Sequence, residues 1–280
     1  MSFISYICIQ FYRIKMMISL KEQGMSLSSV HNCRQLGNYR IGDKRIKPGL
    51  LIRSANLAAL TNEDAALLCE KYRLRRIYDF RSDTEKSGSP DRVPEGVSYV
   101  PLAIEFVKGD MMDVRDARQV VSLLMDYAED KRIQNVCDHL YENILLEEDA
   151  QQAYRTFFRD LVYNHDGKGA VLWHCTQGKD RAGCASALLL LALGADRELV
   201  MQDYNLSRQY YTPFLSKLSP SSEAQKKVLD TLLNANPTAF SAVLDKIEYK
   251  FGSLLNYLED CIKLNAQMRN ILKERYLEDL

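Results

Sequence analysis

Residues 170–194 constrain the fold of this chain more than any other segment does. They begin with a short apolar run, residues 170–173, that is typical of a buried strand. They end with CASALLLLALG, residues 184–194, which is apolar almost all round and suits a helix inside a fold. That helix is too short to cross a bilayer. A buried strand, a turn and a buried helix in this order predict helices packed on a sheet.

From about residue 30 to residue 195, short strand-like runs alternate with helical patterns. After that the pattern is helical. Strand candidates are residues 50–53, 76–80 and 97–102. Thr61 is predicted to cap a helix because Asp64 follows three residues later. The charged residues 105–150 are predicted to form a helical insertion, and residues 196–280 read as helical to the end. The sequence therefore predicts an α/β fold with a mainly parallel sheet flanked by helices.

Composition limits the classes of partner. With 46% hydrophobic residues the 280-residue chain can bury a core, and 37 basic and 37 acidic residues give no general electrostatic case for nucleic acid or an anionic membrane. The chain has seven cysteines, an odd number, and no two of them form a CxxC pair. This favours reduced thiols over a zinc site or a set of disulfides. We expect a cytoplasmic protein without a metal, although secretion without a recognisable signal stays open.

The first residues stand apart from the predicted domain, which covers residues 26–280. Residues 1–20, within the extension 1–25, are largely apolar, but Gln10, Arg13 and Lys15 interrupt them, so a spanning helix is disfavoured. The positive charge comes too late for a signal peptide. We interpret this segment as an extension without stable membrane association, and a membrane tether is the alternative.

The turn HCTQGKDRAG, residues 174–183, carries the chemistry. Five residues separate Cys175 from Arg181, which opens the buried helix. Backbone N–H groups of such a loop can converge on an anion, and the helix N-terminus adds partial positive charge. This environment favours the thiolate of Cys175, a nucleophile at neutral pH. Arg181 presents a planar fork for two phosphate oxygens, and Gly178 allows a tight turn.

Other interpretations of this loop fit less well. A Walker A loop needs Ser or Thr directly after Gly-Lys, where Asp180 stands. A sulfurtransferase usually has a shorter loop between its cysteine and arginine. Cys175, His174 and Arg181 taken singly have ordinary structural explanations, but their joint spacing predicts a phosphatase loop.

The loop resembles that of the bacterial tyrosine phosphatases with dual lipid and protein specificity. Further motifs resemble the same family in matching order over about residues 30–280. They are NCRQLGNYR at residues 32–40, LIRSANL at 51–57, YDFRSDTE at 78–85, YKFGS at 249–253 and YL at 257–258. The resemblance implies a tyrosine-phosphatase-like fold in which the helical residues 196–280 form a lid.

The resemblance also implies the site. Cys175 is the expected nucleophile, Arg181 the phosphate clamp, and no metal or cofactor is implied. The residues expected to line the phosphate are Thr176, Gln177, Gly178, Lys179 and Ala182. The sequence departs from the family at Gln35, where Asp is usual, and at Asn38, where Gly is usual. At Ala182 the family commonly has Ser or Thr, so a hydroxyl that could donate to the leaving sulfur is missing.

The general acid is the least defined member of the predicted site. Asp180 is favoured because it lies in the loop, and Glu105 is the next candidate. Asp110 and Asp113 are further candidates after the predicted strand at 97–102. Asp79 lies at the end of another predicted strand, but it could equally orient arginines. Arg53 and Arg81 are interpreted as structural supports.

The expected substrates are phosphotyrosine proteins, with phosphoserine, phosphothreonine or phosphoinositides as further candidates. A phosphate-binding protein with little turnover and a sulfurtransferase are the alternatives. The oligomeric state stays open.

Overall fold

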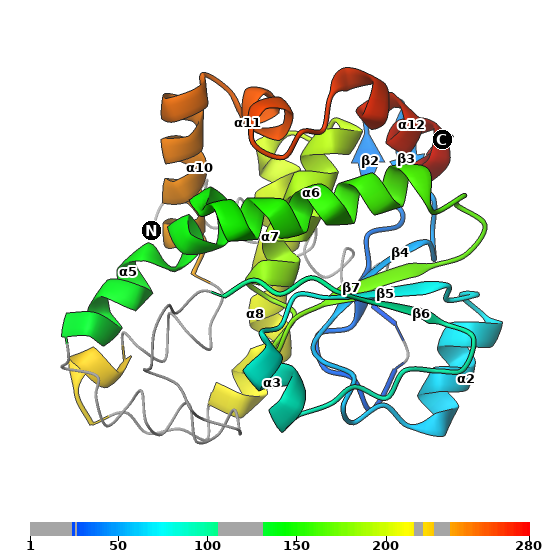
Figure 1. Cartoon of the computed structure of the whole chain (residues 1–280), viewed down its shortest axis with the longest axis horizontal. Coiled ribbons are helices and arrows are strands. Elements are labelled where there is room, and N and C mark those ends of the chain that lie inside the picture. The colour runs from blue at the N-terminus through cyan, green and yellow to red at the C-terminus, as the bar shows by residue number, and fades with distance from the viewer. Residues whose placement is uncertain (1–23, 26, 106–130, 216–220, 227–235) are drawn as a thin grey trace, which may run out of the picture.

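A five-stranded, mainly parallel sheet forms the centre of the molecule (Figure 1). The computed structural model describes residues 24–25, 27–105, 131–215, 221–226 and 236–280. The strands follow the order β1-β4-β7-β5-β6, and only β1 runs antiparallel to its neighbour. Their bounds are Arg34–Gln35 for β1, Leu51–Ser54 for β4, Arg76–Asp79 for β5, Ser98–Pro101 for β6 and Val171–His174 for β7. The predicted α/β class is confirmed.

The middle strand β7 places the predicted site at the carboxyl edge of the sheet. Ser54, the last residue of β4, and Asp79, the last residue of β5, both pair with His174 at the end of β7. Cys175 therefore leaves the sheet between two strand ends. Crevices outside the carboxyl ends of parallel strands are where open α/β sheets usually bind ligands.

Alternating side chains of β7 divide the interior into two cores. Val171 and Trp173 belong to a large core under most of the helices, whereas Leu172 belongs to a smaller one that includes Leu68 of α2. This is the period of two expected of a strand that is buried on both faces.

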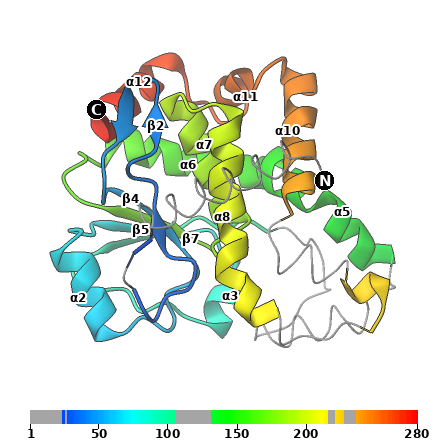
Figure 2. The same ribbon diagram turned by 180° about the vertical axis from the view of Figure 1, so that it is seen from behind.

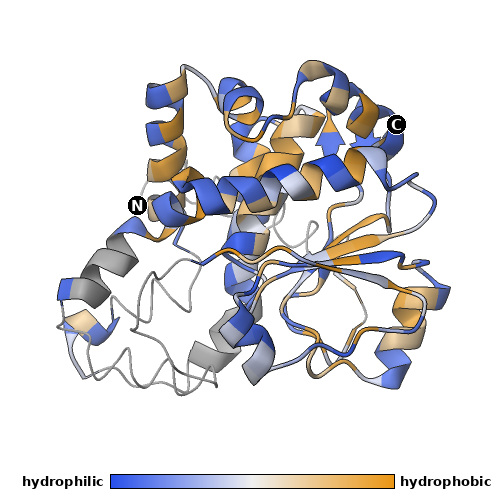
Figure 3. Cartoon of the chain, viewed as in Figure 1, coloured by the Kyte–Doolittle hydropathy of each residue, from blue (hydrophilic) through white to orange (hydrophobic). Residues whose placement is uncertain are grey.

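Helices cover both faces of the sheet. On one side lie α2 (Asn62–Glu70) and α3 (Asp83–Gly88). The helices of the large core are α5 (Lys131–Leu146), α6 (Glu148–Tyr163), α7 (Arg181–Leu193), α8 (Arg197–Leu215), α10 (Pro237–Phe251), α11 (Leu254–Asp260) and α12 (Ala266–Tyr276). Figure 3 shows both colours within the strands, and the outer helix α10 alternates between hydrophilic and hydrophobic residues.

Helix α7 is the buried helix predicted from the sequence. All of its side chains are buried, and Gly194 ends it in the left-handed region at φ 101°. Helix α8 runs beside α7 on the side of the molecule that faces away from the viewer in Figure 1 and towards the viewer in Figure 2. The cap of α2 is confirmed as well, because the Asp64 N–H donates to Thr61 Oγ1 over 3.3 Å.

The C-terminal part departs from its prediction at the very end. It is not wholly helical, because β8 (Leu277–Asp279) pairs with β3 (Lys44–Ile46), which in turn pairs with β2 (Arg40–Ile41) in a second, antiparallel sheet. The predicted insertion is helical over α5, whereas residues 106–130 lie outside the described part. None of the helices in the described ranges is long and apolar enough to span a membrane.

Candidate active site

The turn from β7 into α7 folds back onto the sulfur of Cys175. The Gly178 N–H donates to Cys175 Sγ over 3.2 Å, and the Cys175 side chain is almost fully buried. Gly178 has φ +69°, and a Cβ atom there would lie 2.2 Å from the Ser54 carbonyl oxygen. Both the conformation and the contact therefore require glycine at this position.

The carbonyl groups of residues 176–179 all accept hydrogen bonds from the N-terminal part of the chain. The donors are Asn56 Nδ2 to Thr176 at 3.0 Å, Asn32 Nδ2 to Gln177 at 3.1 Å, and Arg53 Nη2 to Gly178 at 2.7 Å and to Lys179 at 3.2 Å. In a trans peptide the C=O and the following N–H point in opposite directions. The N–H groups that follow these carbonyls are therefore directed inward, as the Gly178 N–H is.

Arg181 is the first residue of α7, and its guanidinium is fixed from the other side of the loop. Nη1 and Nη2 bond to the two carboxylate oxygens of Glu85 at 2.6 and 2.7 Å, and Nη1 also reaches the Ile104 carbonyl at 3.1 Å. Burial on its own would raise the pKa of Glu85, but the charge and hydrogen bonds of Arg181 and a bond from Thr176 hold it at about 2. Arg181 is thus held in one orientation.

Asp180 lies between the loop and the helical half of the molecule. Its carboxylate accepts from Tyr141 of α5 at 2.7 Å and pairs with the buried Lys179 ammonium at 3.0 Å. The Tyr141 hydroxyl in turn contacts that of Tyr204 on α8. About a fifth of the Asp180 side chain is exposed. Lys179, predicted to meet the phosphate, points to Asp180 in this structure.

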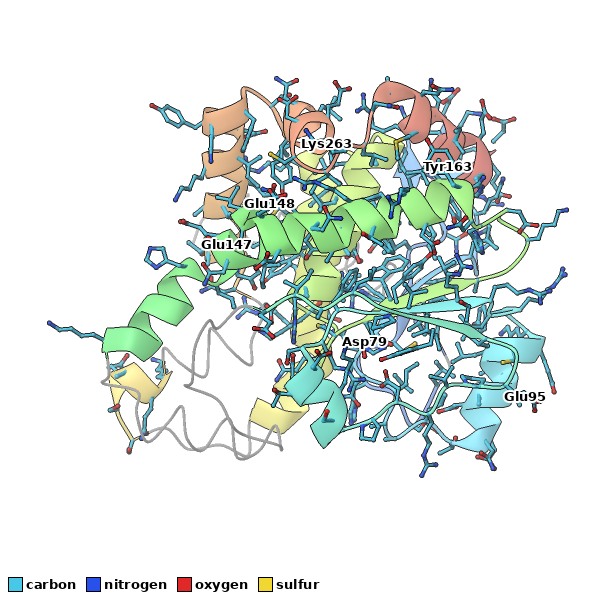
Figure 4. All side chains as sticks on the ribbon, in the orientation of Figure 1. Asp79, Glu95, Glu147, Glu148, Tyr163 and Lys263 are labelled. Atoms are coloured by element: carbon cyan, nitrogen blue, oxygen red, sulfur yellow. The ribbon has the colours of Figure 1, made fainter. Side chains whose placement is uncertain are left out.

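The other predicted acids lie in different surroundings. Glu105 is exposed and directly follows Ile104, whose carbonyl bonds to Arg181. Asp110 and Asp113 lie outside the described residues. Asp79 is buried at the end of β5 (Figure 4) and binds the Arg81 guanidinium at 2.8 Å, so it orients an arginine.

A buried ionic cluster lies under the start of the loop. His174 is 3.7 Å from Asp79 and 3.1 Å from Asp91, although the latter contact lacks hydrogen-bond geometry. In the described part of the chain, Asp79, Asp91 and His174 form a group of potential metal ligands. Arg81 bonds to both carboxylates at 2.8 and 2.6 Å, however, so a fixed cation already offsets part of their charge.

Ala182 belongs to the interior rather than to the loop surface. Its side chain is fully buried, and its carbonyl accepts from Trp173 Nε1 at 3.1 Å and Ser186 Oγ at 2.8 Å. The residue therefore anchors the first turn of α7 to the strand before it.

Several residues in contact with the loop were not predicted to act there. Asn32, Asn56 and Glu85 stand within the quoted motifs but had no assigned role. Tyr141 on α5 carried no signal that could have identified it.

Comparisons with known proteins agree with the predicted family. The model of the tyrosine phosphatase family matches residues 25–278. A Cupriavidus necator protein named as a putative tyrosine-protein phosphatase is 30% identical over 254 residues, which cover 88% of this chain and 86% of that one. The triple specificity protein phosphatase PtpB of Mycobacterium tuberculosis is 25% identical over 240 residues, covering 77% of this chain and 86% of PtpB.

Similarity to solved structures is weaker. Pseudomonas aeruginosa TpbA in complex with pTyr covers 70% of this chain and 96% of its own at 13% identity, with a TM-score of 0.30, too low to carry an argument. The family match instead rests on the sequence, and it includes the whole turn from His174 to Gly183. The predicted family is confirmed: this chain belongs to the tyrosine phosphatase family and is a phosphoric monoester hydrolase.

Proposed function

We propose that Cys175 is the nucleophile and Arg181 the phosphate clamp in the hydrolysis of phosphotyrosine in proteins. The observation that carries the proposal is the 3.2 Å hydrogen bond from the Gly178 N–H to the Cys175 sulfur. An N–H directed at sulfur at the start of a helix stabilises a thiolate and, around it, an anionic phosphate. The loop thus favours both reactants of a thiolate attack on phosphorus.

The reaction proceeds in two displacements. In the first, the Cys175 thiolate attacks phosphorus, the phosphorus–oxygen bond to tyrosine breaks, and a general acid gives a proton to the leaving oxygen. In the second, water attacks the phosphocysteine, the sulfur–phosphorus bond breaks, and phosphate and the thiolate are released. The carboxylate formed in the first step takes the proton of that water.

Arg181 stabilises the charge that spreads over the transferring phosphoryl group. Glu85, which binds both Nη1 and Nη2, fixes the orientation in which the guanidinium meets the phosphate. The main-chain N–H groups directed inward by the 176–179 carbonyls would supply the other donors.

We propose Asp180 as the general acid, with Glu105 as the alternative. Asp180 is next to Arg181, and its partly exposed carboxylate is oriented by Tyr141. A test compares Asp180→Asn and Glu105→Gln on p-nitrophenyl phosphate and on phenyl phosphate, whose leaving group needs a proton far more. Loss of the acid should lower kcat by about 10²–10⁴-fold on phenyl phosphate and much less on p-nitrophenyl phosphate. The variant with equal losses on both substrates lacks this role.

The proposal as a whole is tested by phosphate release from phosphotyrosine peptides, phosphoserine peptides and phosphoinositides. All three classes are included because a relative is named a triple specificity phosphatase. We expect the highest kcat/KM with phosphotyrosine, and we expect Cys175→Ser to abolish turnover while it keeps substrate binding. Binding without turnover by the wild-type protein would support the phosphate-binding alternative instead.

We further propose a cytoplasmic location. A thiolate nucleophile must stay reduced, and Cys175 is free, as are Cys33, Cys69, Cys184 and Cys261.

A further inference from the structure

We infer that Arg53 is a positioning residue of the 175–181 loop, which it holds in the phosphate-binding conformation through the Gly178 and Lys179 carbonyls. The inference rests on the proposed function of that loop. It goes further because it gives a role in the reaction to an arginine that lies on another strand.

The contacts of Arg53 begin with its place in the sheet. It lies on β4, where it pairs with Trp173 of the neighbouring strand β7, and its side chain is fully buried. Nη2 donates to two successive loop carbonyls, at 2.7 Å to Gly178 and 3.2 Å to Lys179. Two bonds from one rigid guanidinium fix both peptide planes, and with them the N–H groups of the residues that follow.

The loop is shaped to receive this guanidinium. A Cβ atom at Gly183 would lie 2.9 Å from Arg53 Nη2, and one at Gly178 would lie 2.2 Å from the Ser54 carbonyl. Both glycines of HCTQGKDRAG therefore leave room for the end of β4. Gly183 thus gives room to the Arg53 side chain, and Gly178 gives room to the Ser54 main chain.

The surroundings of Arg53 make a buried positive charge costly at this position. Arg53 lies directly opposite Arg34 across β1 and β4, and like charges facing each other destabilise a sheet. Burial and the Arg34 charge lower the pKa of Arg53. Within the described ranges its buried Nε–H finds no acceptor, which is a further cost. A buried charge with these costs is weak evidence for a purely stabilising role, which is consistent with a role at the loop.

Asp203 of α8 holds the two arginines together. Its carboxylate bonds to Arg53 Nη1 at 2.5 Å and to Arg34 Nε at 3.3 Å, and it is almost fully buried. Two guanidinium groups on one carboxylate leave a net positive charge beneath the loop, which favours a thiolate and a bound phosphate. The charged groups that interact with Cys175 are Arg53 from β4 and Arg181 from α7, whereas burial keeps the nearby Cys184 and Tyr154 neutral by raising the pKa of each.

Arg34 provides a matched control for Arg53. Among the described residues it bonds to Asn32, Asp203 and Ser207, so it shares the carboxylate of Arg53 and is equally buried. Arg53→Met and Arg34→Met each remove one buried partner of Asp203. Only Arg53→Met also removes a direct donor to the loop, at the Gly178 and Lys179 carbonyls. Arg34 reaches the loop indirectly, through Asn32 and the Gln177 carbonyl.

The experiment measures kcat/KM on p-nitrophenyl phosphate, the melting temperature, and the rate of Cys175 alkylation by iodoacetamide at pH 6, read by mass spectrometry of the Cys175 peptide. We expect both variants to lose similar stability. Each variant removes one positive charge beneath the loop, so both should be alkylated more slowly. Arg53→Met should lose about a hundredfold in kcat/KM, whereas Arg34→Met should lose less than about tenfold.

Two milder variants keep the test decisive if Arg53→Met does not fold. Arg53→Lys should retain most of the alkylation rate, because a charge remains, but should lose kcat/KM, because an ammonium lacks the planar fork. Gly183→Ala keeps Arg53 but displaces it and should also lose kcat/KM. Equal losses in Arg53 and Arg34 variants, or full activity in Arg53→Lys and Gly183→Ala, would overturn the inference. An inactive wild type would overturn the proposed function instead.

Discussion

Glu85 lies in the motif YDFRSDTE without a predicted role, and the structure places it directly against Arg181. It holds Arg181 with both carboxylate oxygens, although 96 residues separate the two along the chain. A carboxylate so close to a phosphate site has opposing effects, because it orients the guanidinium but repels the anionic substrate. The two effects should appear in different kinetic constants.

We predict that Glu85→Gln lowers kcat about tenfold without raising KM for an aryl phosphate. The amide loses the charged two-point grip on Arg181, while removal of the negative charge favours phosphate binding. Steady-state kinetics separate the two constants. A rise in KM at unchanged kcat would contradict the orienting role.

The same substitution makes a prediction about stability and pH. The pKa of Glu85 is lowered from 4.5 to about 2 in the folded protein. Its contribution, on the order of 3 kcal/mol, is therefore present above about pH 4.5 and is lost as the pH falls towards 2. In urea unfolding, the difference in free energy of unfolding between wild type and Glu85→Gln should be largest near neutral pH and should vanish at the acid end. A difference independent of pH would exclude the ion pair as its source.

Ala182 makes a prediction about the second step. A hydroxyl at this position could stabilise the leaving sulfur, so wild type should show a burst with p-nitrophenyl phosphate, and Ala182→Ser should speed its steady state about tenfold or more. Serine is the better probe in a fully buried site, because threonine would also overpack it. Ala192→Ser, near the far end of α7, adds the same hydroxyl away from the loop. Stopped-flow without a burst, or equal rates in both variants, would reject the idea.

At the scale of elements, α3 is the support of Glu85. Ser82 accepts from the Glu85 N–H, and the Glu85 carboxylate accepts from the Ser82 N–H at 2.9 Å while it also holds Arg181. The same carboxylate thus completes the helix cap and positions the clamp. Helix α2 has an analogous cap at Thr61 without a link to the site.

We predict that Ser82→Ala and Thr61→Ala each cost about 1 kcal/mol of stability. Only Ser82→Ala should also lower kcat/KM, by roughly threefold to tenfold, because only α3 carries a residue that contacts Arg181. Urea unfolding and kinetics on the same two proteins check this. Equal activities would mean that Glu85 keeps its position without the cap.

At the scale of the whole molecule, the sequence predicted what depends on local pattern. The strands β4, β5, β6 and β7, the buried helix α7 and the 175–181 loop follow from apolar runs, a glycine and the Cys-to-Arg spacing. The partners of the loop do not, because Arg53 is 125 residues from Gly178 and 150 from Asp203. Which residues meet at the sheet edge depends on strand order, and single-sequence periodicity does not determine strand order.

The C-terminal strand was missed for a related reason. A run as short as Leu277–Asp279 has no period of its own, and it becomes a strand only because the edge of β3 is available to it. The partners of β8 come from the first fifth of the chain, so this pairing joins the two ends of the described fold.

We expect β8 to matter for stability and not for catalysis. Its ion pairs, Arg45 with Glu278 and Lys44 with Asp279, are substantially exposed and should each contribute little. Leu277, by contrast, is buried in the large core, and truncating it should cost about 2–4 kcal/mol. Leu277→Ala should therefore lower the melting temperature by roughly 4–10 °C.

Glu278→Gln and Asp279→Asn are the matched controls and should change the melting temperature by less than about 2 °C. Below its transition, Leu277→Ala should keep the kcat/KM of the wild type, because β8 pairs with β3 at the second sheet and the site lies at the carboxyl edge of the first. A loss of activity at a temperature where Leu277→Ala is fully folded would show that the second sheet is coupled to the loop. In that case the packing of residues 277–279 would help to hold the site in its active conformation.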